Sequence, residues 1–259
     1  TRPASSGGAG FDAQWDGAFV HPVRQALIGA EDAGRDMEAV RNALLHRFDE
    51  NAFARVIYTE SHDEVANGKA RVPEEVDPGN ASSWAAKKKS VLGASLVFTA
   101  PGIPMIFQGQ EFLEDDWFHD KDPLDWSKKE RYAGIVRVYV DLIALRLNRR
   151  GQTAGLCGQQ IDVYHTDQRN KVLAYHRWQD GGPGDSVVVV VNFSTQLLEN
   201  YEVAFPVAGE WKVRFNGDSR YYDPEFSNGG VYRCDALRQE DNAIRGSLVL
   251  PPYTALLLS

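Results

Sequence analysis

The stretch RVIYTESHDE, residues 55–64, decides how the first part of the chain is interpreted. Residues 55–59 are β-branched and aromatic, which favours a buried strand. Residues 60–64 form a polar cluster directly after it. A second short apolar stretch, residues 103–107, also leads into polar residues. With helical patterns between them, these stretches predict βα units and a parallel sheet, whose functional side chains lie where strands end.

Helices are predicted on both sides of residues 55–64 by apolar residues at helical spacing. They cover residues 36–48, a segment from a serine cap at 82 or 83 to about 99, and residues 128–148. The run Lys87-Lys88-Lys89 on the second helix is interpreted as a solvated face. Trp15, at the end of a strand-like segment, is interpreted as a core residue.

Beyond Gly151 the pattern changes to short β-type segments separated by Gly, Asn and Asp turn signals. The predicted strands are 161–165, 171–178, 187–193, 201–205, 211–215 and 247–258. Residues 187–191 are apolar on both faces, which predicts a central strand. The chain therefore divides into an α/β part, residues 1–150, and an antiparallel β-sandwich, residues 151–259.

Composition limits the function classes. The 259 residues carry 28 basic and 36 acidic side chains, a formal charge of −8, which argues against a nucleic-acid partner. No apolar run reaches the roughly 18 residues of a membrane span, and no signal-peptide pattern is present. Cys157 and Cys234 match no metal spacing. We expect a cytoplasmic protein with free thiols and no metal or organic cofactor; a single disulfide remains an open alternative.

The residues from Tyr58 to Val65, continuing through Gly68-Lys69, resemble the fourth signature region of the α-amylase superfamily, glycoside hydrolase family 13, and most closely that of its 1,4-α-glucan branching enzymes. Four further segments resemble, in the family's order, the sixth strand, the eighth strand, the final barrel helix and the last strand of the C-terminal β-domain. They are GFDAQW (10–15), GIPMIFQGQEF (102–112), DLIALR (141–146) and PPYTA (251–255). The resemblance implies strands six to eight of a (β/α)8 barrel over residues 1–150, followed by the antiparallel β-sandwich.

The activity that the resemblance implies is retaining attack on an α-1,4-glucosidic bond, with transfer of the chain to a 6-hydroxyl. Such chemistry needs a carboxylate nucleophile and a carboxylic acid about 5–5.5 Å apart. In the family a third acid, next to a histidine, contacts sugar hydroxyls. Asp63 matches that acid, and His62 matches the histidine. A metal site at His62, Asp63 and Glu64 is disfavoured because adjacent residues rarely point at one ion.

The sequence also departs from the family's pattern. The nucleophile and the general acid belong to the fourth and fifth barrel strands, and no Gly-x-Arg-x-Asp string occurs in the chain. We therefore expect no turnover from these 259 residues alone. An incomplete barrel has free strand edges, which predicts self-association or another covering partner.

Further candidate residues flank these motifs. Glu60 and Glu64 either line a cleft or are solvated, and Gln110 follows the second strand. Glu111 is interpreted as structural, bonding backbone amides or an arginine, in preference to contacting sugar. Trp117 lies in an acidic loop and can stack on the apolar face of a sugar.

The expected partner is an α-glucan: glycogen, starch or maltooligosaccharides. Two alternatives to a branching enzyme stay open. One is an α-amylase-type or trehalose-releasing hydrolase, because water and a sugar hydroxyl can capture the same glycosyl-enzyme. The other is a non-catalytic glucan-binding module.

Overall fold

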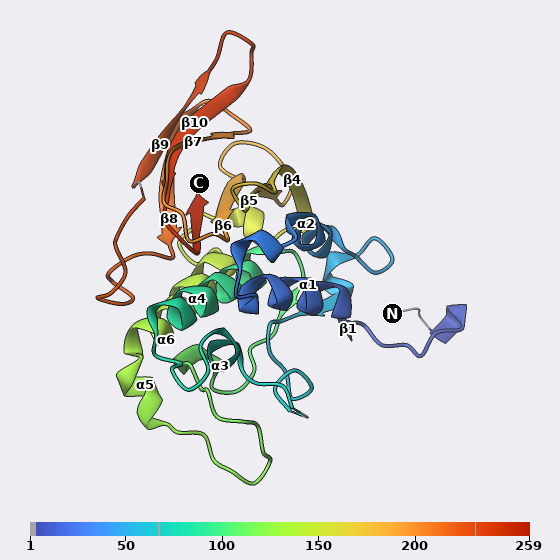
Figure 1. The fold of residues 1–259 in the computed structure, drawn as a ribbon. Helices are drawn as coiled ribbons and strands as arrows, with labels where there is room; N and C mark the ends of the chain where they lie inside the picture. Colours follow the sequence, from blue (N-terminus) through green and yellow to red (C-terminus); the bar gives the residue numbers. More distant parts are fainter. Residues whose placement is uncertain (1–3, 67, 231) are drawn as a thin grey trace.

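The computed structural model describes residues 4–66, 68–230 and 232–259, and it contains two β-sheets connected and covered by helices (Figure 1). The helices are α1 (Gly17–Ile28), α2 (Met37–Leu45), α3 (Val72–Val76), α4 (Trp84–Thr99), α5 (Ser127–Arg131) and α6 (Ala133–Arg146). The strands are β1 (Gln14–Trp15), β2 (Arg55–Ile57), β3 (Ile103–Pro104), β4 (Gln160–Asp167), β5 (Val172–Trp178), β6 (Val187–Asn192), β7 (Leu198–Ala204), β8 (Gly209–Asn216), β9 (Arg233–Arg238), β10 (Ile244–Leu250) and β11 (Thr254–Leu258). Among the described residues, no helix is long and apolar enough to cross a membrane.

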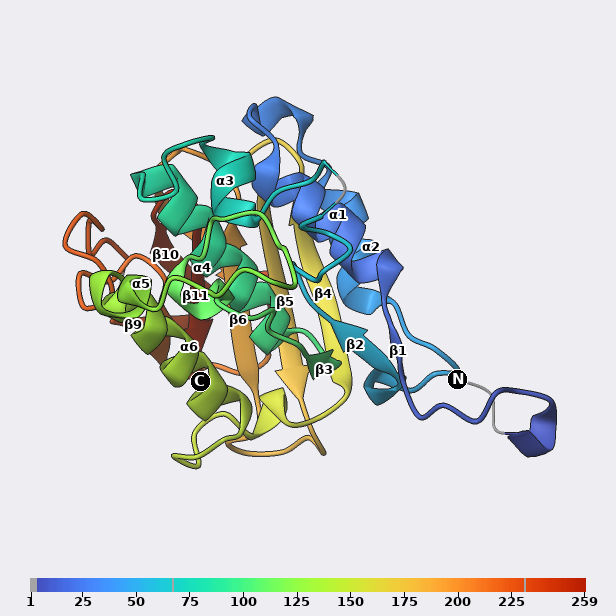
Figure 2. The ribbon, with the colours of Figure 1, turned by 90° about the horizontal axis from the view of Figure 1, so that it is seen from below.

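The first sheet is parallel and has the strand order β1-β2-β3, as the alternation of strands and helices predicts. Figure 2 shows its strands side by side. The strands are short because only two or three residues of each are paired. Within the described ranges the sheet is open at β1 and at β3, and it does not close into a barrel.

The predicted helices over 36–48 and 83–99 are confirmed as α2 and α4, capped by Asp36 and Ser83. Helix α1 was not predicted because it begins at a glycine and contains Pro22, which lowers helix propensity; its start is capped by Asp16. The predicted helix 128–148 is two helices, since Tyr132 leaves the helical conformation between α5 and α6.

The second sheet is antiparallel, with the order β4-β5-β6-β11-β8-β9-β10-β7. Strand β6 is central and pairs with β5 and β11, as its apolar run predicts. The eight strands form one sheet that curls upon itself, where two separate layers were predicted. Side chains join its two ends: the Tyr164 hydroxyl donates to the Ala204 carbonyl at 2.8 Å, and the Tyr201 hydroxyl donates to Asp167 at 2.7 Å.

Two predictions within this sheet are wrong. Strand β9 was missed because exposed charged residues interrupt its apolar positions. The single strand predicted over 247–258 is divided into β10 and β11 by Pro251-Pro252, and Tyr253 adopts a positive φ of 44° there.

The main hydrophobic core is shared between the helices and the second sheet. It joins Leu27 of α1 and Val91 of α4 to Val189 of β6 and Leu257 of β11. Figure 2 shows the helices lying across one face of these strands. A second cluster, which includes Val188 and Trp211, fills the inside of the curled sheet. The cysteines Cys157 and Cys234 are both free thiols.

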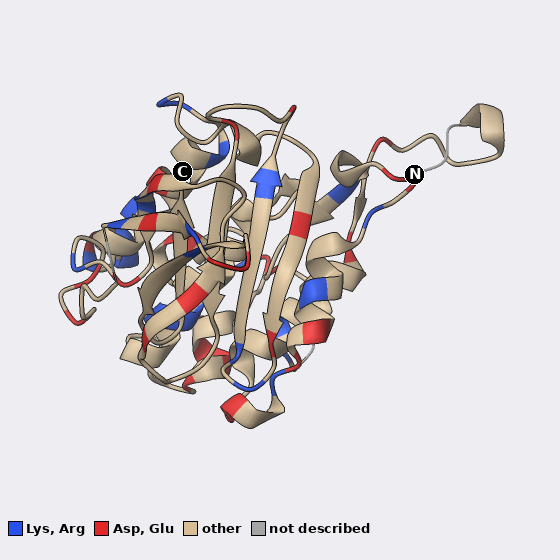
Figure 3. Ribbon diagram, turned by 90° about the horizontal axis from the view of Figure 1, so that it is seen from above, with Lys and Arg blue, Asp and Glu red and all other residues tan. Residues whose placement is uncertain are grey.

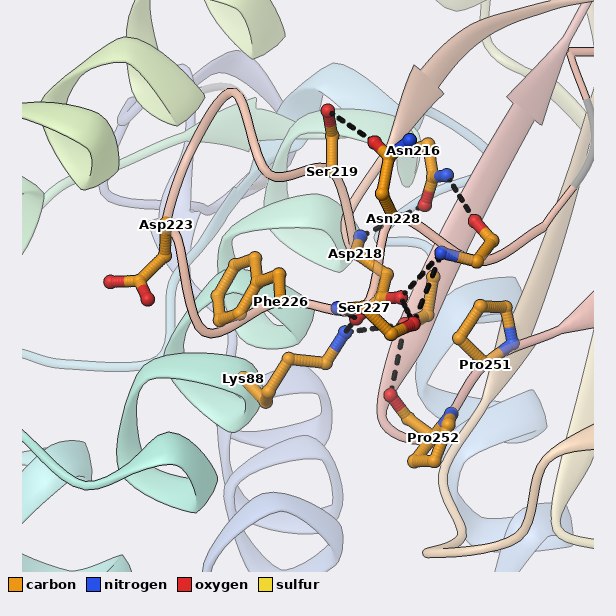
Figure 4. Close-up of polar contacts among 12 residues, drawn as sticks. Lys88, Asn216, Asp218, Ser219, Asp223, Phe226, Ser227, Asn228, Pro251 and Pro252 are labelled. Carbon is orange, nitrogen blue, oxygen red and sulfur yellow. Dashed lines mark hydrogen bonds and ion pairs between the residues drawn. The ribbon is translucent and has the colours of Figure 1, made fainter.

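The interpretation of Lys87-Lys88-Lys89 as a solvated face is wrong, because all of these lysines are buried. Lys88 Nζ donates to Asp218 and to Thr254, at 2.7 Å each (Figure 4). Asp218 in turn accepts hydrogen bonds from the Gly229 amide, at 3.0 Å, and from the Ser227 hydroxyl. The ammonium group is thus buried with its partners supplied by the β8–β9 loop and β11.

The two neighbouring lysines contact different segments. Lys87 Nζ binds Asp223, at 2.9 Å, and Glu225, both in the β8–β9 loop. Lys89 Nζ donates to the Gly29 carbonyl at 3.1 Å, after α1. Elsewhere Figure 3 shows basic and acidic residues interspersed over the helices and loops. The lysine run therefore fixes helix α4 against segments that are distant in sequence.

Removing one partner of the Lys88–Asp218 pair should be strongly destabilising. We expect Asp218→Ala to lower the free energy of unfolding by about 3–5 kcal/mol, because it leaves a buried ammonium without its carboxylate. Lys88→Met/Asp218→Asn removes both charges and should cost less. Urea denaturation measures both variants. Lys212→Ala, at an exposed lysine, is the control and should lower the free energy of unfolding by less than about 1 kcal/mol. If Asp218→Ala lowered the free energy of unfolding by no more than this control does, the prediction would be contradicted.

The burial of these lysines also predicts a pH dependence. Burial lowers the pKa of Lys88 and of Lys89 to about 8, whereas an unfolded lysine titrates near 10.4. Between about pH 8 and 10 these two lysines bind more protons in the unfolded chain than in the folded one, so their contribution to the free energy of unfolding should rise with pH. Urea denaturation at several pH values in this window measures the slope. Lys88→Met/Asp218→Asn removes one of the two lysines and should make the slope less positive than that of the unmodified chain; an unchanged slope would contradict the contribution of Lys88.

Candidate functional site

The polar cluster after β2 is brought to the surface at the carboxyl end of the parallel sheet. Tyr58 and Ser61 are buried, and the chain then turns outward. The side chains of His62 and Asp63 are 54% and 68% exposed, and His62 Nε2 lies 3.3 Å from Asp63 Oδ1. The structure therefore brings together the pair that the sequence predicts as a sugar contact, with both side chains available to a ligand.

Trp15 lies beside this pair and is 43% exposed, so its interpretation as a core residue is wrong. Its ring centroid is 5.5 Å from that of His62 and 5.4 Å from that of Tyr58, both in edge-to-face contact. The indole is exposed because, among the residues that the structure describes, no strand pairs with β1 on its outer side. Burial, with the negative charges of Glu64 and Asp63, raises the pKa of Tyr58 to about 12, so its hydroxyl stays neutral. A flat apolar ring beside hydrogen-bonding groups suits a pyranose.

Glu60 is not a solvated carboxylate. It is buried, and its carboxylate accepts the Val72 amide at 2.7 Å and lies 3.5 Å from Arg71 Nη1. Burial raises the pKa of Glu60, and the positive charge of Arg71 opposes this shift. The carboxylate is committed to holding the loop that follows, which argues against direct sugar contact.

Glu64 is also buried, on the inner side of the loop that carries His62 and Asp63. Its carboxylate lies 3.3 Å from Lys69 Nζ and 3.9 Å from Arg24 Nε of α1. Arg24 also donates to the Thr59 carbonyl at 3.1 Å. Glu64 therefore orders the loop from behind, and the adjacent Asp63 faces outward.

Gln110 and Glu111 lie behind the strand ends. The Gln110 side chain donates from Nε2 to the Thr59 hydroxyl at 2.6 Å, and its Oε1 accepts a hydrogen bond from the Phe107 backbone amide at 3.2 Å, so both ends of this side-chain amide are bonded within the chain. Glu111 is partly buried, and its Oε2 atom has no hydrogen-bond partner among the described residues. The buried Tyr139 hydroxyl is likewise unpaired within the described chain, and burial, with the negative charges of Glu60 and Glu111, raises its pKa.

Trp117 is 57% exposed on the loop after β3. It lines a cavity of about 380 Å³ together with Arg71, Gln108, His119 and Asp122. Its ring centroid is 5.8 Å from that of His119. This open, partly polar cavity lies on the same side of the parallel sheet as His62 and Asp63, because the amide of Phe118 contacts the carbonyl of Val65 at 3.4 Å.

Glu114, Asp115 and Asp116 come close enough together to hold a metal ion. Lys128 Nζ lies among them, bonded to Glu114 and Asp115 and 3.5 Å from Asp116 Oδ2. Burial acts to lower the pKa of Lys128, but the hydrogen bonds to these carboxylates raise it. The ammonium group takes the position that a cation would need.

Residues 163–259 match the family model described as the alpha amylase C-terminal all-beta domain. The whole chain is 31% identical to a 1,4-alpha-glucan branching enzyme of Xanthomonas oryzae pv. oryzae, of which it covers 36%, and 30% identical to one of Rhizobium meliloti, of which it covers 34%. Each alignment covers 100% of this chain. The chain thus spans about a third of the length of these relatives.

Solved structures agree on the fold. A pullulanase complexed with maltotetraose, from Anoxybacillus sp. LM18-11, matches with a TM-score of 0.62 and 21% identity, over 95% of this chain and 35% of that one. An alpha-amylase from H. orenii matches with a TM-score of 0.61 and 17% identity, over 96% of this chain and 49% of that one. Residues 163–259 are thus similar to the alpha amylase C-terminal all-beta domain, and the whole chain is similar to part of the 1,4-alpha-glucan branching enzymes.

Proposed function

We propose that the protein carrying these residues processes α-glucans, by retaining transfer of an α-1,4-linked chain to a 6-hydroxyl. The observation that carries the proposal is the exposed His62–Asp63 pair beside Trp15, at the carboxyl end of β2. Relatives aligned over the whole chain are named 1,4-alpha-glucan branching enzymes, which supports the proposal of chain transfer between α-glucans.

The chemistry of the pair suits the role of a third acid. An ionised Asp63 can accept hydrogen bonds from two neighbouring sugar hydroxyls, and such bonds strengthen as charge develops on the ring. His62 would donate to a hydroxyl of the same sugar, and Trp15 would cover its apolar face. We assign neither the nucleophile nor the general acid to a residue of this chain, since the required Gly-x-Arg-x-Asp string is absent from it.

We further propose that β1, β2 and β3 are the sixth to eighth strands of a (β/α)8 barrel. Their parallel order and intervening helices support this arrangement. Phe11 and Ile103, at the two open edges, are exposed apolar side chains that a neighbouring strand would cover. For the chain alone, self-association through these edges is the corresponding proposal.

A second candidate function is a glucan-binding module without catalysis. The exposed Trp117 and its cavity favour it, because aromatic platforms bind sugar without any reacting acid. An α-amylase-type or trehalose-releasing hydrolase would use the same third acid. Iodine staining combined with debranching of the product separates transfer from hydrolysis.

The sugar-contact role of Asp63 predicts a loss of affinity when its charge is removed. We expect Asp63→Asn to weaken binding of maltoheptaose about tenfold or more, because hydrogen bonds to a charged group contribute about 1.5–3 kcal/mol. Isothermal titration of the 259-residue chain measures it. Glu74→Gln, at a half-buried position of α3, is the matched control and should bind as the unmodified chain does. Equal affinity of Asp63→Asn and the control would contradict the role.

A third acid alone cannot cleave a glucosidic bond, because retaining attack needs two further carboxyl groups. We expect the 259-residue chain to release no reducing ends from amylose and to leave its iodine colour unchanged. Reducing-sugar assay and iodine absorbance over a long incubation measure this. A rate clearly above that of buffer would mean that other acids of the chain perform the chemistry.

A further inference from the structure

Arg71 is a buried arginine whose guanidinium joins three separate segments around the candidate site. Its Nη1 donates to the Gln108 carbonyl at 2.9 Å and lies 3.5 Å from Glu60 Oε2. Its Nε donates to the Asp116 carbonyl at 3.1 Å. The guanidinium of an arginine carries its donors on separate atoms of one rigid, planar fork, whereas the three donors of a lysine ammonium all lie on a single atom, so a lysine cannot reproduce the spacing of these contacts.

These contacts fix the backbone on both sides of Trp117. The carbonyl of the preceding residue, Asp116, is held by Arg71. The ring of the following residue, Phe118, packs edge to face on Phe107 with centroids 5.4 Å apart. Phe107 itself lies under the Arg71 guanidinium, 4.9 Å from its ring centroid. The backbone at Trp117 therefore cannot shift without breaking contacts that depend on Arg71.

The other end of the network leads to Asp63. Glu60, the carboxylate partner of Arg71, lies three residues before Asp63 on the same loop. The Phe118 amide also contacts the Val65 carbonyl, two residues after Asp63, at 3.4 Å. With consecutive Cα atoms about 3.8 Å apart, this places the Cα atoms of Asp63 and Trp117 within about 20 Å. One extended oligosaccharide can reach both.

We propose that Arg71 is a positioning residue that sets the separation between two sugar contacts, the His62–Asp63 pair and Trp117. The inference rests on the proposed function and deepens it, because it makes Arg71 responsible for a preference for long α-glucan segments over short ones. A long segment engages both contacts at once, so the second contact forms at high effective concentration. A disaccharide occupies one contact and gains nothing from the fixed separation.

The test compares maltose with maltoheptaose by isothermal titration of the 259-residue chain. The unmodified chain should bind maltoheptaose at least about tenfold more tightly than maltose. Arg71→Lys keeps the buried charge beside Glu60 but loses the fork. It should reduce this ratio to about one while leaving the affinity for maltose unchanged. Arg131→Lys, on the exposed α5, is the control and should keep the ratio.

A cycle with Trp117→Ala separates positioning from general loss of structure. If Arg71 acts through Trp117, Arg71→Lys/Trp117→Ala loses no more affinity for maltoheptaose than either single variant. Additive losses, or an equal loss of affinity for both sugars in Arg71→Lys, would overturn the proposal. Should Arg71→Lys fail to fold, Glu60→Gln/Arg71→Met removes both charges together and serves in the same cycle.

The outcomes also distinguish the two proposals. Binding of neither sugar by the unmodified chain would overturn the proposed glucan contact and, with it, the role of Arg71. Binding with a length preference that Arg71→Lys leaves intact would overturn the role of Arg71 alone. The ratio of the two affinities is the deciding measurement, because a merely structural arginine would change both together.

Discussion

Buried backbone carbonyls that have no partner in a helix or strand must be hydrogen-bonded, and in this protein arginines meet that requirement. Arg55 is the clearest case: it is fully buried and donates to the carbonyls of Ala43, Leu44 and Pro101, while Asp16 balances its charge. It thereby joins the end of β1, the end of α2 and the entry to β3. The same pattern recurs at Arg24, Arg35, Arg71, Arg146 and Arg177. The parallel strands are too short to hold these segments by pairing alone.

Local signals in the sequence predict much of the fold. The caps Asp36 and Ser83 and the apolar spacing after them are enough to place α2 and α4, because helix starts depend on neighbouring residues. The run Val187–Val191 places the central strand for a similar reason, since burial on both faces requires apolar residues at every position. Lys88 could not be placed this way, because Asp218 lies 130 residues further along the chain. From the sequence alone, a run of lysines on a helix is therefore interpreted as a solvated face, because the distant residues that pair with it are not known.

In the candidate site, too, features set by neighbouring residues could be predicted, and features set by distant residues could not. His62 and Asp63 are adjacent in sequence, so their meeting needs no tertiary information. Glu60 looks equally available in the sequence, yet it is buried, because the guanidinium of Arg71 lies over its carboxylate. The sequence does not point to Arg71, because most of its hydrogen-bond acceptors are backbone carbonyls. Every residue has a backbone carbonyl, so the residue types do not show which ones bind an arginine. Exposure of Trp15 depends on β1 being the edge of its sheet, and that is a property of the topology.

The buried lysines of α4 have a consequence for how chains of this fold can recombine. The carboxylate partners of Lys87 and Lys88 all lie in the β8–β9 loop, so the positive charges of the helix are neutralised by the C-terminal part of the chain. A recombination event that replaced the C-terminal sheet by another of the same shape would leave two ammonium groups enclosed without carboxylates. Inheritance of this α4 is thus linked to inheritance of Asp218 and Asp223, although more than a hundred residues separate them. The two halves of the chain are expected to exchange between related proteins as one unit.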